Sequence, residues 1–417
     1  MNIKMDDRIL KYLKDNKNIL ITGQAGTGKS SNLKYIKEWA KENNRNIAIT
    51  ASSGISALNL NLGATTFHSF MKMQLGDKPI EEYIKFTRFN KKQSKMLKEL
   101  TDLVIEEFFM LNPDFFEKAS KLIGIIRNLP DIPFGGVRII LVGDLLQLPS
   151  VKCDKYIFET ETWKDLNLQP VILKTIYRQT DVGFQKILSN LRIANLGEEE
   201  IKFLKSRCIK YEGDNIIKLF PKKDQTAEYN KYRMNKLEGE LITFKGKFSV
   251  DNCTLSKDKQ KEKLVTLFKD CLATPTIELK VGCVVIHLVN KPEDNIFNGS
   301  KGIVESFQDG FPLVKFDDKK ILIKNYTWTV ETKTEGIFYY SQIPLLAAWA
   351  INIHKSQGLS LDCPVEIDLS SNIFEYSQAY VAISRITKAE NVYISNFNKD
   401  SFFVDDKVIK FYEGLKE

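Results

Sequence analysis

The stretch "NILITGQAGTGKS", residues 18–30, joins a short apolar run to a glycine-rich loop of fixed spacing. The run 18–22 predicts a buried strand, and the loop 23–30 fits the pattern G-x-x-x-x-G-K-[ST] before a helix near Ser30. Glycines let backbone N–H groups curve around a phosphate, and a helix N-terminus favours the bound anion. The stretch therefore predicts a nucleotide-phosphate site, with an ordinary glycine-rich turn as the alternative.

Single positions in this loop have separate expected tasks. The ammonium of Lys29 would neutralise phosphate oxygens, and the hydroxyl of Ser30 would help to hold a magnesium ion. The loop thus implies ATP and Mg²⁺ as cofactors. The residues expected to contact the nucleotide are Gly23, Ala25, Gly26, Thr27, Gly28, Lys29, Ser30 and Ser31.

Further β-branched runs at 46–51, 102–107 and 137–144 alternate with helical patterns, which predicts an α/β fold with parallel sheets. Closely spaced strands with Gly, Asn and Asp turns begin near 279, and the α/β pattern returns after about 345. We therefore predict two α/β domains with an all-β module inserted in the second. The predicted boundaries are 1–170 for the first domain, 171–278 with 344–417 for the second, and 279–343 for the insert.

Acidic side chains follow two of the predicted strands. "DLVIEE" ends in Glu106 and Glu107, and "LVGDLLQLPSV" supplies Asp144 and Gln147. Ligands gather at the carboxyl ends of parallel strands, so Glu106 is expected to hold Mg²⁺ and Glu107 to orient the attacking water as base. Gln147 could sense the γ-phosphate, and a solvated loop amide is an equal alternative.

Bulk composition sets wider limits. The chain has 417 residues, of which 43% are apolar and 27% charged, as in ordinary globular proteins. Its net charge of +8 allows a polyanionic partner without requiring one. Six cysteines without a Cys-x-x-Cys pair and three histidines argue against a zinc site or a disulfide framework. Without an apolar run of about 18 residues or a signal segment, we expect an intracellular protein, cytoplasmic if bacterial or viral, with the nucleus as an alternative.

A family resemblance rests on seven blocks in order: "TGQAGTGKS", "TASSGISALNLNLGATTFHSF", "LVIEEFFML", "FGGVRIILVGDLLQLPSV", "IYRQTD", "LLAAWAINIHKSQGLSLD" and "AYVAISRITKAENVYI". Together, over residues 22–394, they resemble superfamily 1 helicases of the Pif type (petite integration frequency), whose relatives are RecD-like and Dda-like enzymes. The segment "MLNPDFFEKASKLIGIIRN" followed by "PFGG" resembles the part that marks the Pif branch. The resemblance implies two RecA-like P-loop domains with a Src-homology-type barrel in the second, which embraces DNA or serves only as a scaffold.

The resemblance also implies roles for residues outside the phosphate loop. Arg178 and Arg385 would be arginine fingers that reach the γ-phosphate, with a surface arginine as the alternative for each. Gln357 and Gly358 would line the nucleotide cleft. For His68 and His354 the alternative to DNA contact is a packing histidine. The implied DNA contacts are Ser52, Ser53, Gly54, Thr66, Phe67, His68, Trp349, His354, Lys355 and Ser356.

The family places a strand-separating wedge or pin in the first domain, here at 71–100. The stretch 83–98 carries six basic residues and no acid, interleaved with Tyr83, Phe86 and Phe89, of which Phe86 and Phe89 are expected to contact DNA. However, basic residues at 85, 88, 92 and 95 follow helical spacing, so a solvated helix face is at least as good an interpretation.

The chain departs from the family pattern at a few positions. Glu106 replaces the usual Asp, Phe108 and Phe109 replace Ile-Ser, and Asn352 replaces Thr or Ser. The start "MNIKMDDRIL" also lacks a glutamine that would read adenine. Because Glu106 keeps its charge and the remaining groups are present, we interpret the site as active with an altered metal shell. Those remaining groups are Lys29, Ser30, Glu107, Arg178 and Arg385.

The resemblance implies an ATP-dependent DNA helicase that moves 5′ to 3′ on single-stranded DNA and acts at single/double-strand junctions as a monomer. At family level it implies DNA repair, recombination, replication and telomere maintenance. A nucleic-acid clamp gated by ATP, or a translocase that does not unwind, is the alternative, as is an ATPase that moves on RNA. A small-molecule kinase would need neither "AWAINIHKSQG" nor the two arginines.

Overall fold

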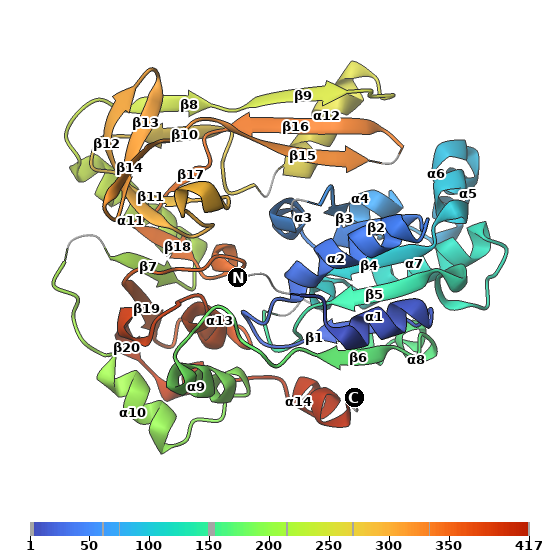
Figure 1. Ribbon diagram of the computed structural model, residues 1–417, viewed down its shortest axis with the longest axis horizontal. Helices are drawn as coiled ribbons and strands as arrows, with labels where there is room; N and C mark the ends of the chain where they lie inside the picture. Colours follow the sequence, from blue (N-terminus) through green and yellow to red (C-terminus); the bar gives the residue numbers. More distant parts are fainter. Residues whose placement is uncertain are drawn as a thin grey trace.

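Two α/β units lie side by side in the computed structural model, and a β-rich region spans both (Figure 1). This arrangement brings elements far apart in the sequence around one central space. The structure describes residues 4–60, 62–74, 76–148, 155–213, 216–268, 271–332 and 334–415.

The first unit is built on a parallel sheet in the order β3-β2-β4-β5-β1-β6. Its strands are β1 (Ile19–Thr22), β2 (Ile47–Ala51), β3 (Thr65–Thr66), β4 (Asp102–Glu106), β5 (Arg138–Val142) and β6 (Gln169–Ile172). Its helices are α1 (Asp7–Lys14), α2 (Lys29–Glu42), α3 (Gly54–Leu60), α4 (Phe67–Met71), α5 (Ile80–Phe89), α6 (Lys91–Glu99), α7 (Pro113–Ile126) and α8 (Glu161–Asp165). The predicted parallel α/β fold is confirmed.

The central strands β4 and β5 are buried along their whole length, as expected of strands that are covered on both faces. Successive side chains point to opposite faces of the sheet. Val104 therefore joins a core with Leu33 of α2, whereas Ile105 joins a second core with Phe115 of α7. Packing on both faces therefore fixes the position of β4 and of the acidic residue at its end.

A buried ionic network holds the opposite end of the same strands. The carboxylate of Asp102 accepts hydrogen bonds from Nε of Arg138 at 2.5 Å and from Nε of Arg45 at 2.6 Å. Arg138 also donates to the carbonyl oxygen of Leu13, and its guanidinium lies 4.9 Å from the ring centre of Trp39. This network joins β4, β5 and α1 at the edge of the sheet that lies away from the phosphate loop.

The second unit has a smaller parallel sheet in the order β18-β7-β19-β20. Its strands are β7 (Ile217–Phe220), β18 (Ala350–Asn352), β19 (Val365–Leu369) and β20 (Val392–Phe397). The helices of this part of the chain are α9 (Val182–Arg192), α10 (Glu198–Ser206), α11 (Lys223–Lys236), α13 (Gln378–Ser384) and α14 (Asp406–Gly414). No helix among the described residues is long and apolar enough to cross a membrane.

The β-rich region contains sheets in the orders β14-β13-β12-β11-β17, β15-β16-β9 and β10-β8. The elements are β8 (Ile242–Lys245), β9 (Lys247–Asp251), α12 (Lys257–Phe268), β10 (Thr276–Leu279), β11 (Val284–His287), β12 (Lys301–Gln308), β13 (Phe311–Phe316), β14 (Lys319–Leu322), β15 (Tyr326–Thr332), β16 (Gly336–Gln342) and β17 (Leu345–Ala347). The strands β8 and β9 pair with β10 and β16, so this region starts well before the expected residue 279. The single closed barrel stays a prediction.

The basic stretch of the first unit forms two helices, α5 and α6, at the far edge of the unit (Figure 1). Asn90 ends α5, and its side chain caps α6 by accepting a hydrogen bond from the N–H of Gln93. The helical spacing predicted across 85–95 is therefore interrupted. Phe86 is 52% exposed and Phe89 is 79% exposed, so both rings face solvent.

Replacing Asp102 by Asn should lower the free energy of unfolding by about 3–5 kcal/mol, because it leaves the guanidinium of Arg138 buried without its counter-ion. Urea unfolding would measure this loss. The control is Glu161→Gln, which removes an exposed ion pair with Lys164 and should change the free energy of unfolding far less, because solvent screens that pair. Equal losses in the two variants would contradict a structural role for the buried network.

Candidate functional site

The phosphate loop runs from β1 to α2, as the sequence predicted. Gly23, Gly26 and Gly28 have φ angles of 146°, 82° and 79°, which side chains other than glycine rarely adopt. Space is also short, since a Cβ atom on Gly26 would lie 2.7 Å from Cβ of Arg178. A Cβ atom on Gly23 would lie 2.5 Å from the carbonyl oxygen of Leu173. The glycines of the motif are therefore required by the backbone itself.

The ammonium of Lys29 lies inside this loop. Its Nζ donates hydrogen bonds to the carbonyl oxygens of Gly23 at 2.7 Å and Gln24 at 3.1 Å. Burial lowers the pKa of Lys29, while the carboxylates of Asp144 and Glu107 act in the opposite direction. The lysine is thus close to the acids at the ends of β4 and β5.

Glu106 ends β4 directly beside the first turn of α2. Oγ of Ser30 donates a hydrogen bond of 2.5 Å to Oε1 of Glu106, which joins the two predicted Mg²⁺ ligands. Burial raises the pKa of Glu106 to about 8, and the neighbouring Glu107 adds to the rise. A hydroxyl and a carboxylate are oxygen donors of the kind that Mg²⁺ prefers. The described residues contain no group of three His, Cys, Asp or Glu side chains that could hold a metal alone, so a cation here would also need ligand or water oxygens.

Glu107 has two unusual features. Its φ angle is 52°, in the left-handed region that costs energy for a side chain other than glycine. Its Oε2 is buried and has no hydrogen-bond partner in the described part of the chain. Burial raises the pKa of Glu107, and the charges of Lys29 and Arg385 oppose this rise. Strain and an unsatisfied buried oxygen together indicate a group that is kept ready for a ligand.

Two arginines reach the site from the part of the chain that follows β6. Nε of Arg178 donates to Oγ of Ser360 at 3.0 Å, and its Nη1 donates to the carbonyl oxygen of Ser384. Arg385 caps α13 and donates from Nε to the carbonyl oxygen of Val381 at 3.0 Å. Burial lowers the pKa of Arg178 to about 9, and the nearby charge of Arg385 lowers it further. Two cations held this close together favour an anion between them.

Asp144 follows β5 and pairs with Arg192 of α9 at 2.6 Å. Burial opposes its charge, yet Arg192 and Lys29 hold the pKa of Asp144 below its ordinary value. The backbone N–H of Gln147 bonds to the carbonyl oxygen of Asp144 and closes a turn. Gln147 is 5% exposed, which argues against a solvated loop amide. Contact with a γ-phosphate stays a prediction, and 149–151 of the quoted block lie outside the described residues.

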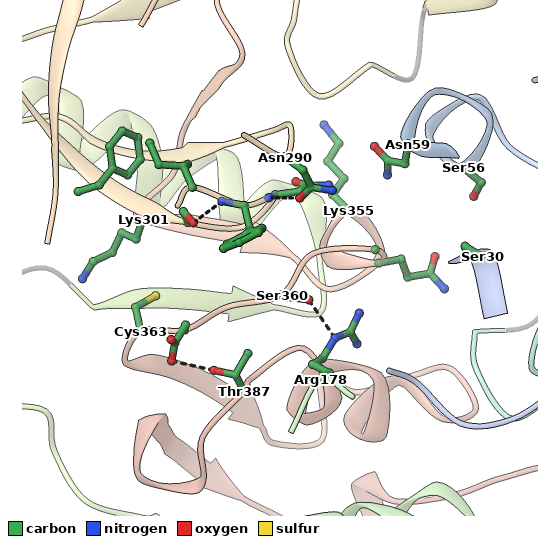
Figure 2. A pocket seen from close by; sticks show the side chains of 18 of the residues that line it. Ser30, Ser56, Asn59, Arg178, Asn290, Lys301, Lys355, Ser360, Cys363 and Thr387 are labelled. Atoms are coloured by element: carbon green, nitrogen blue, oxygen red, sulfur yellow. Dashed lines mark hydrogen bonds between the residues drawn. The ribbon is translucent and has the colours of Figure 1, made fainter. Parts of the chain in front are cut away.

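A cavity of about 1190 Å³ lies where the two units and the β-rich region meet (Figure 2). Figure 2 shows Ser30 on one side and Arg178, bonded to Ser360, on another. Lys29, Gln147 and Arg385 are outside its lining. The structure therefore brings together much of the predicted nucleotide site with part of the predicted DNA site. The predicted residues that line the cavity are Ser30, Ser53, Glu106, Glu107, Arg178, His354, Lys355, Gln357 and Gly358.

Several predicted DNA contacts lie in accessible positions on loops or helix ends. Ser52 and Ser53 precede α3 and are partly exposed, whereas Gly54 is buried. Oγ1 of Thr66 caps α4 by accepting from the N–H of Ser69. Lys355 is exposed at the cavity.

The two candidate histidines differ in their surroundings. The ring centre of His68 lies 4.1 Å from that of Phe115, which supports a packing role. His354 lines the cavity, and its Nε2 lies 2.6 Å from Oε2 of Glu375. A phosphate that approached His354 would therefore meet a histidine already paired with a carboxylate.

Three predicted DNA contacts need correction, since Phe67, Trp349 and Ser356 are at most 1% exposed. Phe67 packs edge-on against Phe115, Trp349 belongs to the core of the second unit, and Oγ of Ser356 donates to the carbonyl oxygen of its own turn. Neighbouring residues of one motif point in different directions, so only some can face a ligand. These three side chains pack the fold.

Packing also explains two departures from the family pattern. Phe108 and Phe109 are buried, and a Cβ atom on Gly143 would lie 2.9 Å from the ring of Phe109. Asn352 is buried at the end of β18, where its side-chain N–H bonds to the carbonyl oxygen of Pro221 at 2.8 Å. These side chains fill space and hydrogen-bond the backbone.

Sequence reasoning missed several residues of the site. The hydroxyl of Tyr380 accepts a hydrogen bond of 3.2 Å from the N–H of Ala25 in the phosphate loop. Ser360 holds Arg178, and Arg192 holds Asp144. The signal for Tyr380 was present, because it shares the block "AYVAISR" with the predicted finger. Ser360 lies within the quoted block "LLAAWAINIHKSQGLSLD", whereas Arg192 lies outside every block.

Comparisons with known proteins give one consistent answer. The model of the family described as PIF1-like helicase matches residues 6–190. The chain is 32% identical to an "ATP-dependent DNA helicase PIF1" of Emericella nidulans, over 95% of this chain and 60% of the relative. The chain spans 60% of that relative's length, and 64% and 63% of the PIF1 helicases of Danio rerio and Rattus norvegicus.

Solved structures show the same similarity over nearly the whole chain. Bacteroides sp Pif1 in complex with ADP-AlF4 is 26% identical, with a TM-score of 0.84 over 99% of this chain and 97% of that chain. Bacteroides Pif1 in complex with ADP-AlF3 and single-stranded DNA is 26% identical over the same shares, with a TM-score of 0.63.

Replacing Glu106 by Gln should stabilise the nucleotide-free protein at alkaline pH. Because the folded-state pKa is raised to about 8, the stability linked to this group is complete below pH 4.5 and is lost as the pH rises to about 8. A neutral amide removes that loss, so the expected gain is about 2–4 kcal/mol at pH 8.5 and much less at pH 5. Thermal unfolding in EDTA at both pH values would measure it, with exposed Glu42→Gln as control. A gain in stability that does not depend on pH would contradict this explanation.

Proposed function

The chain belongs to the family of Pif1-like helicases, and on that premise we propose that it is an ATP-dependent DNA helicase. It would move along single-stranded DNA and unwind duplexes by ATP hydrolysis between its two RecA-like units. The observation that carries the proposal is the cavity that joins Ser30, Glu106 and Glu107 of the first unit to Arg178 of the segment leading into the second. The direction, 5′ to 3′, comes from the family resemblance.

The phosphate loop and its neighbours would hold the nucleotide. Loop N–H groups and the ammonium of Lys29 would bind phosphate oxygens, while Ser30 and Glu106 fit an Mg²⁺ ion as adjacent oxygen donors. When bound, that ion would neutralise charge on the phosphates. Gln357 and Gly358 would border the nucleotide from the second unit.

Glu107 and the two arginines would act directly on the water and the phosphate that react. The unsatisfied Oε2 of Glu107 would accept a hydrogen bond from the attacking water, and its raised pKa would let the carboxylate take up a proton. Arg178 and Arg385 would stabilise the charge that develops on the phosphoryl oxygens. Because these arginines come from the part of the chain that follows the first unit, hydrolysis would depend on how closely the two units approach.

The DNA partner would be single-stranded DNA and single/double-strand junctions, bound by a monomer. A complex of Bacteroides Pif1 with single-stranded DNA supports this choice. We assign phosphate contacts to Ser53 on the first unit and Lys355 on the second, since hydroxyl and ammonium groups suit contacts that ignore sequence. Exposed Phe86 and Phe89 on α5 would separate strands at the junction.

A second candidate is a clamp that binds nucleic acid under ATP control and hydrolyses slowly. The observation that favours it is Glu106, one methylene longer than the usual Asp and buried with a raised pKa. The two candidates differ in turnover, which makes ATP hydrolysis the decisive measurement.

Steady-state ATP turnover should rise when oligo-dT single strand is added and should be lost in Lys29→Ala. Glu107→Gln should reduce turnover by about 10²- to 10⁴-fold while nucleotide binding remains, because a neutral amide cannot take up the proton. Exposed Glu42→Gln on α2 is the matched control. Turnover retained in Glu107→Gln would remove its assignment as base.

Absent turnover with DNA binding still strengthened by ATP would favour the clamp, and Glu106→Asp would then be tested for restored turnover.

Phe89→Ala should slow unwinding of a forked duplex several-fold and leave turnover stimulated by single-stranded DNA within about twofold, because the ring faces solvent and is outside the lining of the cavity. A gel or fluorescence unwinding assay beside the turnover assay would separate the two effects. Tyr232→Ala, at a 53% exposed aromatic on α11, is the control. Unchanged unwinding would leave α5 and α6 as a solvated helix face.

A further inference from the structure

Helix α14 follows the second unit in the sequence but packs on the first (Figure 1). Val408 is 2% exposed and belongs to the core of the first unit. The ring of Phe411 stacks at 4.6 Å on Phe158 and meets Trp163 edge-on at 5.7 Å. The helix is therefore fixed to the first unit by apolar burial.

Polar contacts at the start of the helix strengthen this attachment. The hydroxyl of Tyr156 donates to Oδ2 of Asp405 at 2.8 Å, and Nζ of Lys407 lies 3.2 Å from Oε1 of Glu159. Neither contact touches the nucleotide cavity. Both contacts therefore hold α14 on the first unit and have no direct part in the nucleotide site.

The other end of α14 reaches the base of the phosphate loop. The hydroxyl of Tyr412 lies 2.7 Å from Oγ1 of Thr22, donates to Oδ1 of Asp144 at 3.0 Å and accepts from the N–H of Leu145 at 3.1 Å. Thr22 is the last residue of β1 before the loop, and Asp144 follows β5. A phenol has one donor and two acceptor positions, so these contacts use its full capacity.

Arg192 completes the cluster from the second unit. Its guanidinium contacts both carboxylate oxygens of Asp144, at 2.6 and 3.1 Å, and lies 4.8 Å from the ring centre of Tyr412. Asp144 thus has side-chain partners from α9 and α14, while its own backbone holds the turn to Gln147. Because a buried carboxylate keeps its position only through such partners, losing one should let it move.

We propose that Tyr412 is a positioning residue for ATP hydrolysis, which fixes Asp144 and Thr22 so that Arg192 and the turn at Gln147 stay aligned with the phosphate loop. This inference rests on the proposed function. Tyr412 lies outside the lining of the cavity, and its hydroxyl bonds to Asp144 rather than to the candidate metal ligands Ser30 and Glu106, so it would act through Asp144.

The proposal makes a specific kinetic prediction. Nucleotide binding depends on the glycine backbone of the loop and on α2, both of which Tyr412 leaves untouched, so KM should change by less than about threefold. Alignment of Arg192 and Gln147 with the reacting phosphate should suffer, and kcat should fall by about 10- to 100-fold. A split of this kind is not expected from general loosening of the fold.

The experiment compares Tyr412→Phe with Tyr156→Phe in the 417-residue chain. Both remove one phenol hydroxyl that holds α14, but only the first loses contact with Asp144. DNA-stimulated kcat should fall in Tyr412→Phe and remain within about twofold of the parent in Tyr156→Phe. Equal effects in the two variants, or an unchanged kcat in Tyr412→Phe, would overturn the proposal.

A second measurement is independent of turnover. The rise in Tm that ADP causes in EDTA should be the same in the parent and in Tyr412→Phe, because nucleotide binding is retained. A smaller rise would make Tyr412 part of nucleotide binding and overturn its assignment as a positioning residue. An unmodified chain without DNA-stimulated turnover would instead overturn the proposed function, and with it this inference.

Discussion

The structure depends above all on how charges are accommodated at one edge of the first sheet. Lys29, Glu106, Glu107 and Asp144 gather where β1, β4 and β5 end, in surroundings that shift the pKa of each. An unpaired charge in such a place costs several kcal/mol, so partners must come from elsewhere in the chain. Arg192 brings one such partner from α9. The contact between the two units is therefore an electrostatic requirement as well as an apolar one.

Some charges of the site remain without partners in the described part of the chain, as the proposed hydrolysis of ATP would require. The nearby charge of Arg385 lowers the pKa of Arg178, while Glu107 keeps an oxygen without a partner among the described residues, on a strained backbone. A polyphosphate placed among these groups would relieve the repulsion between the arginines. Release of phosphate after hydrolysis would restore the repulsion between the arginines. More negative charge between the two units would therefore favour their closure more strongly. In this way the bound nucleotide would influence the relative position of the units.

Sequence patterns predicted the phosphate loop and the acids because each is specified locally. Gly23, Gly26 and Gly28 have φ angles that glycine alone adopts easily, and an acid after a buried strand must lie at the sheet edge. Burial could not be predicted in the same way. Trp349 lies in a block that also carries exposed Lys355, and nothing in the string distinguishes the core side from the open side. Likewise, β8 and β9 alternate with lysines and were overlooked, since half-exposed strands lack a continuous apolar run.

The least predictable part of the site is the one contributed by α14. Its sequence "DKVIKFYEG" indicates an amphipathic helix and no more, because the surface that receives it is formed more than 240 residues earlier, as at Glu159 opposite Lys407. Only the folded chain shows that Phe411 attaches the helix by packing, whereas Tyr412 forms hydrogen bonds to the base of the phosphate loop. A chain whose second unit precedes a helix docked on the first unit cannot separate the two freely. The distance between the units is then limited by the same helix that carries Tyr412, so the opening of the cleft and the position of Asp144 depend on one element.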